Sequence, residues 1–227
     1  MRLASLDRML LRGLWRLRGQ SLATALVIGA GIALYIMSAG ALASIEATRA
    51  AYYDQYRLAN LFASAKRAPL SLVPRIAALP SVRMVESRVS GAVLLDIPGF
   101  GEPVNGIVHS LPRDRNLSLN RIHLVRGRIP DAANQSEVLV SDPFARAHGL
   151  QGGDRIAAII KGKRQWLRIV GTALSPEHVF TIPPGNLTTD DKRFGVLWLD
   201  RDMLEGAFDQ EGAFNELLLL VDASAPI

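Results

Sequence analysis

The sequence predicts an α+β protein in which one transmembrane helix is followed by a mixed α/β extracytoplasmic domain of two small subdomains. Two observations predict this class. The 227-residue chain has no charged residue from Gly19 to Ile45, and the sequence after this run alternates short apolar segments with turn residues. As a helix, the 24 residues from Leu22 to Ile45 would extend about 36 Å, enough to cross a hydrocarbon core of roughly 30 Å. We therefore expect the spanning helix at residues 21–46 and the external domain at residues 47–227.

The charges on either side of the run predict its orientation. Five arginines and one acidic residue precede it, whereas the charges just after it are balanced. Because positively charged flanks stay in the cytoplasm, we expect a cytoplasmic N-terminus and a periplasmic or extracellular main domain on the inner (plasma) membrane. The rival interpretation is a cleaved signal peptide, but apolar segments of signal peptides extend to about 15 residues and this run is longer. The residues expected to fix the topology at the cytoplasmic interface are Arg8, Arg12, Arg16 and Arg18.

Residues 1–20 have an amphipathic pattern of their own. Leucines recur at spacings of three and four from Leu3 to Leu17, while three of the arginines repeat at every fourth position on another face. This periodicity is typical of an amphipathic helix. We expect a cytoplasmic interfacial helix in contact with membrane lipid. The alternative is that these arginines only set the topology.

Small residues recur within the predicted span. Ala25, Gly29 and Ala33 are spaced four residues apart and so share one ridge of a helix. Membrane helices approach one another closely through such ridges. We therefore expect this ridge to pack against another spanning helix, although alanine and glycine are also common in spans that have no such partner.

The composition excludes several classes of function. The formal net charge is +5, but residues 1–20 contribute +4, so the remaining 207 residues carry 21 bases and 20 acids. The high isoelectric point therefore reflects the membrane flank, and no basic face is expected for nucleic acid. The absence of cysteine from the sequence excludes disulfides, thiolate metal sites and thiol catalysis within it.

The external domain is expected to contain short strands and short helices bounded by turn residues. Apolar and alternating segments predict strands, and capping residues with proline or glycine predict helix ends. In particular, we expect Ser141-Asp142-Pro143 to cap a helix, with proline at its first helical position, and we expect that helix to stop at His148-Gly149. A subdomain is expected at about 135–175. The predicted strands are residues 58–66, 82–97, 104–111, 137–141, 155–161, 165–171, 195–199 and 215–221, and the predicted helices are residues 70–79, 142–148 and 202–208.

Four phrases in this domain carry a family resemblance. They are Arg126–Pro130, Glu137–Ser141, Gly149–Ile156 and Ile169–Gly171. In this order and at this spacing they resemble the "GR.P", "EVVVS", "GL..GD.I" and "VVG" phrases of the periplasmic core domain of MacB-like and FtsX-like ABC transporter permeases. An amphipathic start, one spanning helix and a large external domain also occur there, so the resemblance covers essentially the whole chain.

The resemblance implies a permease subunit that couples ATP hydrolysis on a separate chain to movement of the external domain. The implied roles are efflux, lipoprotein release or control of an envelope enzyme. The implied partners are an ABC-type ATPase subunit, a second permease chain in a dimer, and an extracytoplasmic adaptor or cargo protein. Such permeases have four spanning helices, so we expect this sequence to be an N-terminal fragment, with a single-pass protein as the alternative.

The sequence predicts no catalytic, cofactor-binding or metal-binding residues. It has no Gly-x-x-x-x-Gly-Lys-Ser/Thr loop, so ATP is expected to bind a partner chain. The adjacent Glu177 and His178 are expected to point apart on an extended loop. The competing functions are a membrane-anchored receptor or scaffold and, less favoured, an anchored hydrolase. The four histidines, expected to be surface or satisfied polar residues, are His109, His123, His148 and His178.

Overall fold

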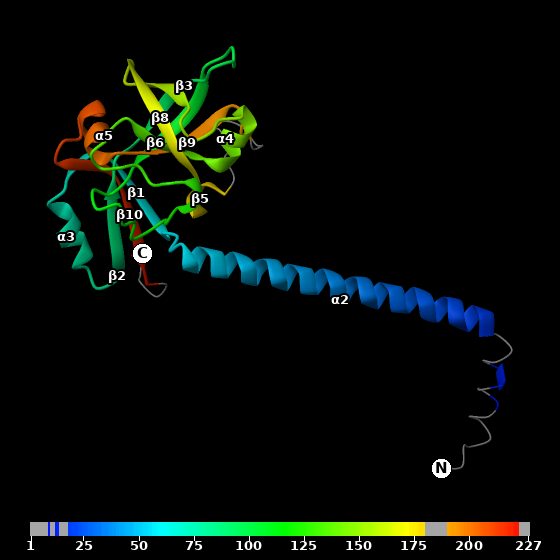
Figure 1. Cartoon of the computed structure of the whole chain (residues 1–227). Helices are drawn as coiled ribbons and strands as arrows, with labels where there is room; N and C mark the ends of the chain where they lie inside the picture. Colours follow the sequence, from blue (N-terminus) through cyan, green and yellow to red (C-terminus); the bar gives the residue numbers. More distant parts are fainter. Residues whose placement is uncertain (1–8, 10–11, 14–17, 180–189, 223–227) are drawn as a thin grey trace. The chain divides into compact units, whose positions relative to one another are not determined.

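The computed structural model describes residues 9, 12–13, 18–179 and 190–222 (Figure 1). The chain divides into two compact units, Met1–Ala51 and Tyr52–Ile227. All of the described strands belong to the second unit, where they form two sheets. The class predicted from the sequence, α+β with one apolar N-terminal helix, is confirmed.

The apolar helix is α2, which extends from Arg18 to Gln55. Its 38 residues correspond to about 57 Å, so the helix is longer than the hydrocarbon core is thick. Among the described residues, α2 is the one helix that is long and apolar enough to cross a membrane. It contains no buried residue, and the hydroxyls of Thr24 and Thr48 donate to backbone carbonyls of its own preceding turns. The helix continues beyond the predicted 21–46 at both ends, and most of residues 1–20 lie outside the described residues.

One of the two sheets of the domain is three-stranded and antiparallel. Its strand order is β1 (Leu61–Pro69), β10 (Ala213–Val221) and β2 (Val82–Arg88), and α3 (Leu72–Ala77) packs against it. The start of β1 pairs with the end of β10, where Leu61 lies opposite Leu219. The oxygen and the nitrogen of the Asn60 side-chain amide also bond to the backbone of Val221, at 2.9 and 2.8 Å. The chain therefore enters this sheet beside the last described strand.

The second sheet has seven strands in the order β5-β8-β6-β9-β4-β3-β7. Because β7 also pairs with β8, six of these strands close into a barrel and β5 lies outside β8. Apolar side chains from the barrel strands, together with Phe144 of α4, form the largest buried core. The strands are β3 (Ser90–Asp96), β4 (Val104–Ser110), β5 (His123–Gly127), β6 (Glu137–Ser141), β7 (Arg155–Ile160), β8 (Lys163–Leu174) and β9 (Phe194–Leu199), and the helices are α4 (Asp142–His148), the 3-10 turn η1 (Pro176–His178) and α5 (Arg201–Ala207).

One strand prediction is wrong, and one strand was not predicted. Residues 82–97 are not one strand, because the chain leaves the first sheet after Arg88 and enters the barrel at Ser90. At the fully buried Val89, the backbone N–H donates to Ser110 Oγ and the carbonyl accepts from Ser110 N, which replaces the missing ladder bonds. Strand β5 was not predicted, since all five of its residues are exposed and give no alternating pattern.

The predicted subdomain at about 135–175 contains β6, α4, β7 and β8. These strands pair with one another, but β6 also pairs with β9 and β7 with β3, which come from outside that range. The barrel therefore joins this segment to the strands around it. Its division into subdomains stays a prediction.

Candidate functional site

The three small residues predicted to pack in the membrane lie along α2 and are exposed in this chain. A Cβ atom added to Gly29 would meet no heavy atom within 4 Å. The ridge of Ala25, Gly29 and Ala33 is thus open to another helix, and its packing stays a prediction.

The arginines predicted at the cytoplasmic interface are described only in part. Arg12 and Arg18 are exposed, and Arg18 is the first residue of α2. Arg8 and Arg16 lie outside the described residues. Their shared role in topology therefore stays a prediction.

The phrases that carry the family resemblance form a scaffold in which backbones approach closely. Gly127 of β5 pairs with Gly171 of β8, and Gly127 has a φ of 77°. A Cβ atom at Gly127 would lie 2.2 Å from the carbonyl oxygen of Val170, and one at Gly171 would lie 2.6 Å from that of Arg126. Both glycines are therefore needed for the close pairing of these strands.

An ion pair joins the first of these phrases to the second. Arg128 donates through Nη1 and Nη2 to the two carboxylate oxygens of Glu137, at 2.6 and 2.5 Å. Glu137 also accepts from the backbone N–H of Asp131 at 3.0 Å. The hydrogen bonds and charge of Arg128 lower the pKa of the buried Glu137 carboxyl. These residues hold the β5–β6 connection against the barrel, and the arrangement offers no reacting group.

The third phrase provides helix termination. Gly149 adopts a left-handed φ of 65° and ends α4, as its position predicted, and Pro143 lies in the first turn. The predicted Ser141 cap is wrong, because its side chain makes no capping hydrogen bond. Ser141 Oγ instead accepts from the backbone N–H of Val196 in the neighbouring strand.

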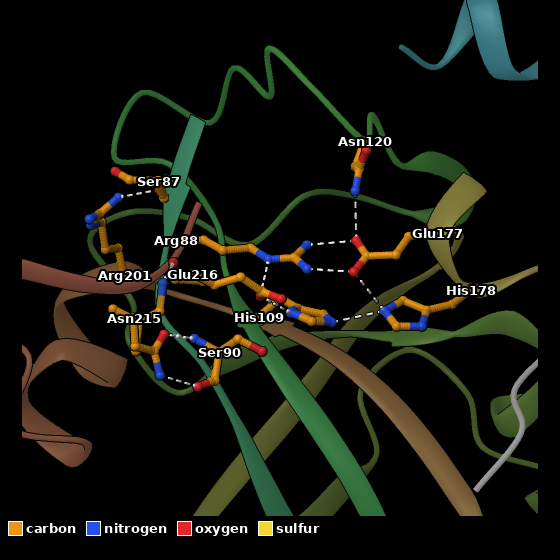
Figure 2. Close-up of polar contacts among 12 residues, drawn as sticks. Ser87, Arg88, Ser90, His109, Asn120, Glu177, His178, Arg201, Asn215 and Glu216 are labelled. Carbon is orange, nitrogen blue, oxygen red and sulfur yellow. Dashed lines mark hydrogen bonds and ion pairs between the residues drawn. The ribbon is translucent and has the colours of Figure 1, made fainter. Parts of the chain in front are cut away.

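The chemistry of the domain is concentrated in a buried polar cluster between the two sheets (Figure 2). Arg88 ends β2 and Glu216 lies opposite it in β10, so both come from the three-stranded sheet. His109 comes from β4 of the barrel, and Glu177 and His178 come from η1, which follows β8. The buried polar cluster is defined as Arg88, His109, Asn120, Glu177, His178 and Glu216.

Arg88 is the centre of this cluster. Its Nη1 and Nη2 donate to the two oxygens of Glu177 at 2.8 and 2.5 Å, and its Nε donates to Glu216 at 2.7 Å. The Arg88 side chain is 7% exposed, so two carboxylates compensate one buried guanidinium. Burial alone would raise the pKa of Glu177, but the hydrogen bonds and charge of Arg88 outweigh it and lower that pKa.

Two histidines face each other beside this ion pair. The Nε2 atoms of His109 and His178 lie 2.8 Å apart, and their rings are stacked with centroids 5.0 Å apart. Burial lowers the pKa of both imidazoles, and that of His109 falls well below its ordinary value. The expectation that Glu177 and His178 point apart is wrong, because η1 turns both side chains into the same cluster, with Glu177 Oε1 3.9 Å from His178 Nε2.

The segment that follows α2 is connected to this cluster through the loop between β4 and β5. The backbone carbonyls of Tyr56 and Arg57 accept from the N–H groups of Arg121 and Asn120, at 2.8 and 2.9 Å. The Asn120 side chain accepts from Ala59 N at 2.7 Å and donates to Glu177 at 2.7 Å. Asn120 thus bonds at once to the segment after the helix and to the buried ion pair.

Further contacts hold this loop in place. Glu86 accepts from the backbone N–H groups of Ser118 and Leu119 at 2.6 and 2.8 Å, and its burial raises its pKa. Tyr56 Oη lies 2.9 Å from His123 Nδ1. The loop is therefore fixed from the side of β2, while the Tyr56 side chain joins the segment after α2 to β5.

Sequence reasoning missed Arg88, Asn120 and Glu216. The available signal was weak but physical: Glu216 directly precedes the apolar run of β10, and Arg88 directly precedes the apolar Val89. A charged residue inside a buried strand must be paired. The identity of the pairs could not be read, because they join segments more than 80 residues apart.

Known proteins resemble this chain in structure. No protein-family model and no curated protein matches the sequence. Among solved structures, the chain is similar to the extracellular domain of the noncanonic ABC-type transporter YknZ from Gram-positive bacteria, with 10% identity over 74% of this chain and 82% of that chain and a TM-score of 0.47. It is also similar to the periplasmic region of MacB from Actinobacillus actinomycetemcomitans, with 10% identity over 72% of this chain and 68% of that chain and a TM-score of 0.43.

Proposed function

We propose that this chain is a permease subunit of an ABC transporter, in which a separate ATPase hydrolyses ATP and the external domain moves in response. In this proposal the chain has no catalytic site of its own. Its N-terminus lies in the cytoplasm and its domain lies outside the inner (plasma) membrane. Its partners are the ATPase, a second permease chain and an extracytoplasmic adaptor or cargo protein, and its work is efflux, lipoprotein release or control of an envelope enzyme.

The observation that supports the proposal is the placing of the resembling phrases on one scaffold. Phrases that are up to about 40 residues apart in the sequence meet at the β5–β8 glycine pair and at the Arg128–Glu137 ion pair. Segments that matched the family phrases by chance would not be expected to pack against one another. The resemblance therefore describes one structural unit, and that unit follows an apolar helix long enough to span a membrane.

The geometry also offers a route for transmitting movement. Helix α2 continues through Glu46–Gln55 without a break, which makes the segment outside the hydrocarbon core stiff. Beyond it, Tyr56 and Arg57 bond to the loop that carries Asn120, and Asn120 bonds to Glu177. A displacement of the chain at Tyr56 would thus reach the polar cluster that joins the two sheets. We infer that this cluster, rather than a catalytic group, is the part of the domain that responds.

Affinity purification from native membranes tests the proposal. The full-length protein, solubilised in mild detergent, is expected to carry with it a chain that has a phosphate-binding Gly-x-x-x-x-Gly-Lys-Ser/Thr loop and that hydrolyses ATP. Gly29→Leu is expected to reduce recovery of a second spanning partner while leaving membrane insertion intact, since leucine is as apolar as lipid requires but holds helices apart.

The matched control for this variant is Val27→Ala, which changes an exposed residue on the face of α2 opposite the ridge. Its recovery of spanning partners is expected to equal that of wild type. Recovery of the wild-type protein without any ATP-hydrolysing chain would contradict the proposal and favour the receptor or scaffold. Unchanged recovery of spanning partners with Gly29→Leu would show that the Ala25, Gly29 and Ala33 ridge faces lipid.

A further inference from the structure

The hydrogen bond between His109 and His178 satisfies only one of the two ring nitrogens of His109. A neutral imidazole carries one N–H, and a single proton lies between the two Nε2 atoms at 2.8 Å. The other nitrogen of His109, Nδ1, is buried and has no hydrogen-bond partner among the described residues. Whichever ring donates the shared proton, His109 therefore keeps an unpaired polar atom in a residue that is 1% exposed.

Three potential ligand atoms converge at this point. One ring nitrogen from each of His109 and His178 and one oxygen of Glu177 all lie within 4.8 Å of one another. Figure 2 shows the three side chains converging. The side chains of Glu177 and His178 are 15% and 18% exposed, so the group is partly accessible to solvent. Two imidazoles and one carboxylate with an open fourth position are a familiar ligand set for zinc.

We propose that His109, His178 and Glu177 bind a divalent transition-metal ion of the zinc class. An ion between the two Nε2 atoms uses both lone pairs and leaves each ring with its N–H at Nδ1. The Nδ1–H of His109 then faces Glu216, whose Oε2 lies 3.9 Å away. Metal-bound histidines usually donate their second N–H to such a carboxylate. This ligand set is independent of the proposed transport function.

The charges of the cluster suit a cation. Arg88 contributes one positive charge and Glu177 and Glu216 contribute two negative charges, so the group is net negative while both imidazoles are neutral. Metal ions bind the neutral form of imidazole, so the two histidines add no positive charge of their own when they serve as ligands. Arg88 holds Glu177 through both oxygens, and each oxygen has a second lone pair. Asn120 uses the second lone pair of Oε2, so Oε1 is the oxygen available to the ion.

The rings need a small adjustment to accept the ion. Two nitrogens bound to zinc at about 2.0–2.1 Å in tetrahedral geometry lie about 3.3 Å apart, so the 2.8 Å separation must open by about half an ångström. His178 belongs to a short turn at the partly exposed side of the cluster, where such a shift disturbs little. The bound ion would fasten η1 to β4. Magnesium and calcium are excluded as preferred ions because they select oxygen ligands.

Cobalt(II) titration of the full chain tests the proposal. The detergent-solubilised protein, prepared without a polyhistidine tag and stripped with EDTA, is expected to develop the visible absorption of tetrahedral cobalt at one equivalent and to lose it when zinc is added. His178→Gln is the main variant because it is at the accessible side, and it is expected to weaken cobalt binding by at least about 100-fold. His148→Gln is the matched control, since His148 contacts the backbone of Lys192 outside the cluster.

A second measurement keeps the test independent of folding. Zinc is expected to raise the melting temperature of the wild type and of His148→Gln but not of His178→Gln, with circular dichroism showing that all three are folded. Equal cobalt spectra and affinities for wild type and His178→Gln would overturn the proposal. Absence of a tetrahedral cobalt spectrum in folded wild-type protein would do so as well.

Discussion

Gly171 faces Gly127 across the β5–β8 pair, and neither position has room for a side chain. We predict that Gly171→Ala lowers the free energy of unfolding by about 1–3 kcal/mol, because the new methyl group would lie 2.6 Å from one backbone oxygen and 2.9 Å from another. Thermal unfolding of the full chain measures the loss. Gly152→Ala is the control, since a Cβ there meets no heavy atom within 4 Å. Equal melting temperatures for the two variants would contradict this account of the glycine pair.

Glu137 is expected to make the stability of the domain depend on pH. Because Arg128 lowers the pKa of Glu137 in the folded state below its ordinary value of 4.5, the unfolded chain binds the proton more readily. The resulting stabilisation is complete above the unfolded-state pKa and is lost as the pH falls through it toward the folded-state pKa. Between about pH 6 and pH 3, the melting temperature of wild type should therefore fall more steeply than that of Glu137→Gln.

The control for this prediction is Glu102→Gln, at an exposed turn position. Its pH profile is expected to follow that of wild type, so the comparison isolates Glu137 from the other carboxyl groups that titrate in both proteins. Parallel profiles for wild type and Glu137→Gln would show that the ion pair with Arg128 contributes nothing to acid stability.

Single residues were predictable where their role depends on neighbours in sequence. Gly149 as a helix end and Pro143 in a first turn are local roles, and both are confirmed. The role of His109 was not predictable in this way, because its partners come from η1 and β10. The sequence showed Glu177 and His178 as neighbours, but only the fold shows that η1 directs both toward Arg88 and His109.

At the scale of elements, α2 carries the strongest expectation about function. Inserting two glycines after Ala51 should weaken the helix there by about 1 kcal/mol per glycine, while the barrel is unaffected. If the proposed transport function holds, ATP should then be hydrolysed without the movement of the domain that it drives in wild type. The readout is the mobility of a nitroxide attached at Arg75→Cys on the exposed face of α3, measured with and without ATP in the complex with the ATPase.

An insertion of two alanines at the same place is the matched control. It lengthens the helix and rotates the subsequent residues by the same amount but preserves helix propensity. Loss of the ATP response with glycines alone would indicate that stiffness matters. A response to ATP equal to wild type in the glycine variant would mean that residues 46–56 are a passive tether.

Most elements of the domain were predictable because their patterns are local. The helices α3, α4 and α5 and most strands occur near their expected positions, with bounds that differ by a few residues. The division of residues 82–97 between two sheets was not predictable, because a buried valine such as Val89 is equally compatible with a continuous strand and the break is made by Ser110 from another strand. When a chain segment changes its pairing strand, the local alternation of polar and apolar side chains does not show it.

At the scale of the whole molecule, the orientation in the membrane is the expectation most open to a direct test. The sequence has no cysteine, so a single introduced cysteine reports one position without background. Arg75→Cys should react with a membrane-impermeant maleimide in intact cells, whereas Arg12→Cys should react only after permeabilisation, because arginine-rich flanks remain in the cytoplasm. Replacing Arg8, Arg12, Arg16 and Arg18 together by glutamate should weaken this difference.

The reverse labelling pattern, with Arg12→Cys accessible in intact cells and Arg75→Cys protected, would exclude the proposed orientation. Labelling of both positions only after lysis would place the domain in the cytoplasm. Expression and folding of each variant are checked by labelling after complete solubilisation, where both cysteines should react.

The closed barrel is the feature of the whole molecule that the sequence did not reveal. Closure depends on β7 pairing with both β3 and β8, and on β4 pairing in parallel with β9, which lies about 90 residues further along the chain. Such pairings are decided by which strands the core brings together, and strand periodicity carries no information about partners. The α+β class followed from local patterns, whereas the barrel followed from long-range contacts.

The pairing of Leu61 with Leu219 has a mechanical consequence. Because β1 and β10 are antiparallel, the point where the chain enters the sheet and the end of its last described strand lie side by side. A force pulling Asn60 and Val221 apart would load the β1–β10 hydrogen bonds one after another, as in opening a zipper, and not all together. The resistance at the first step then depends on the two bonds of the Asn60 amide to Val221. The Asn60 side chain thus holds the first point at which the sheet would separate under tension. The three-stranded sheet would open there before the force reached the closed barrel.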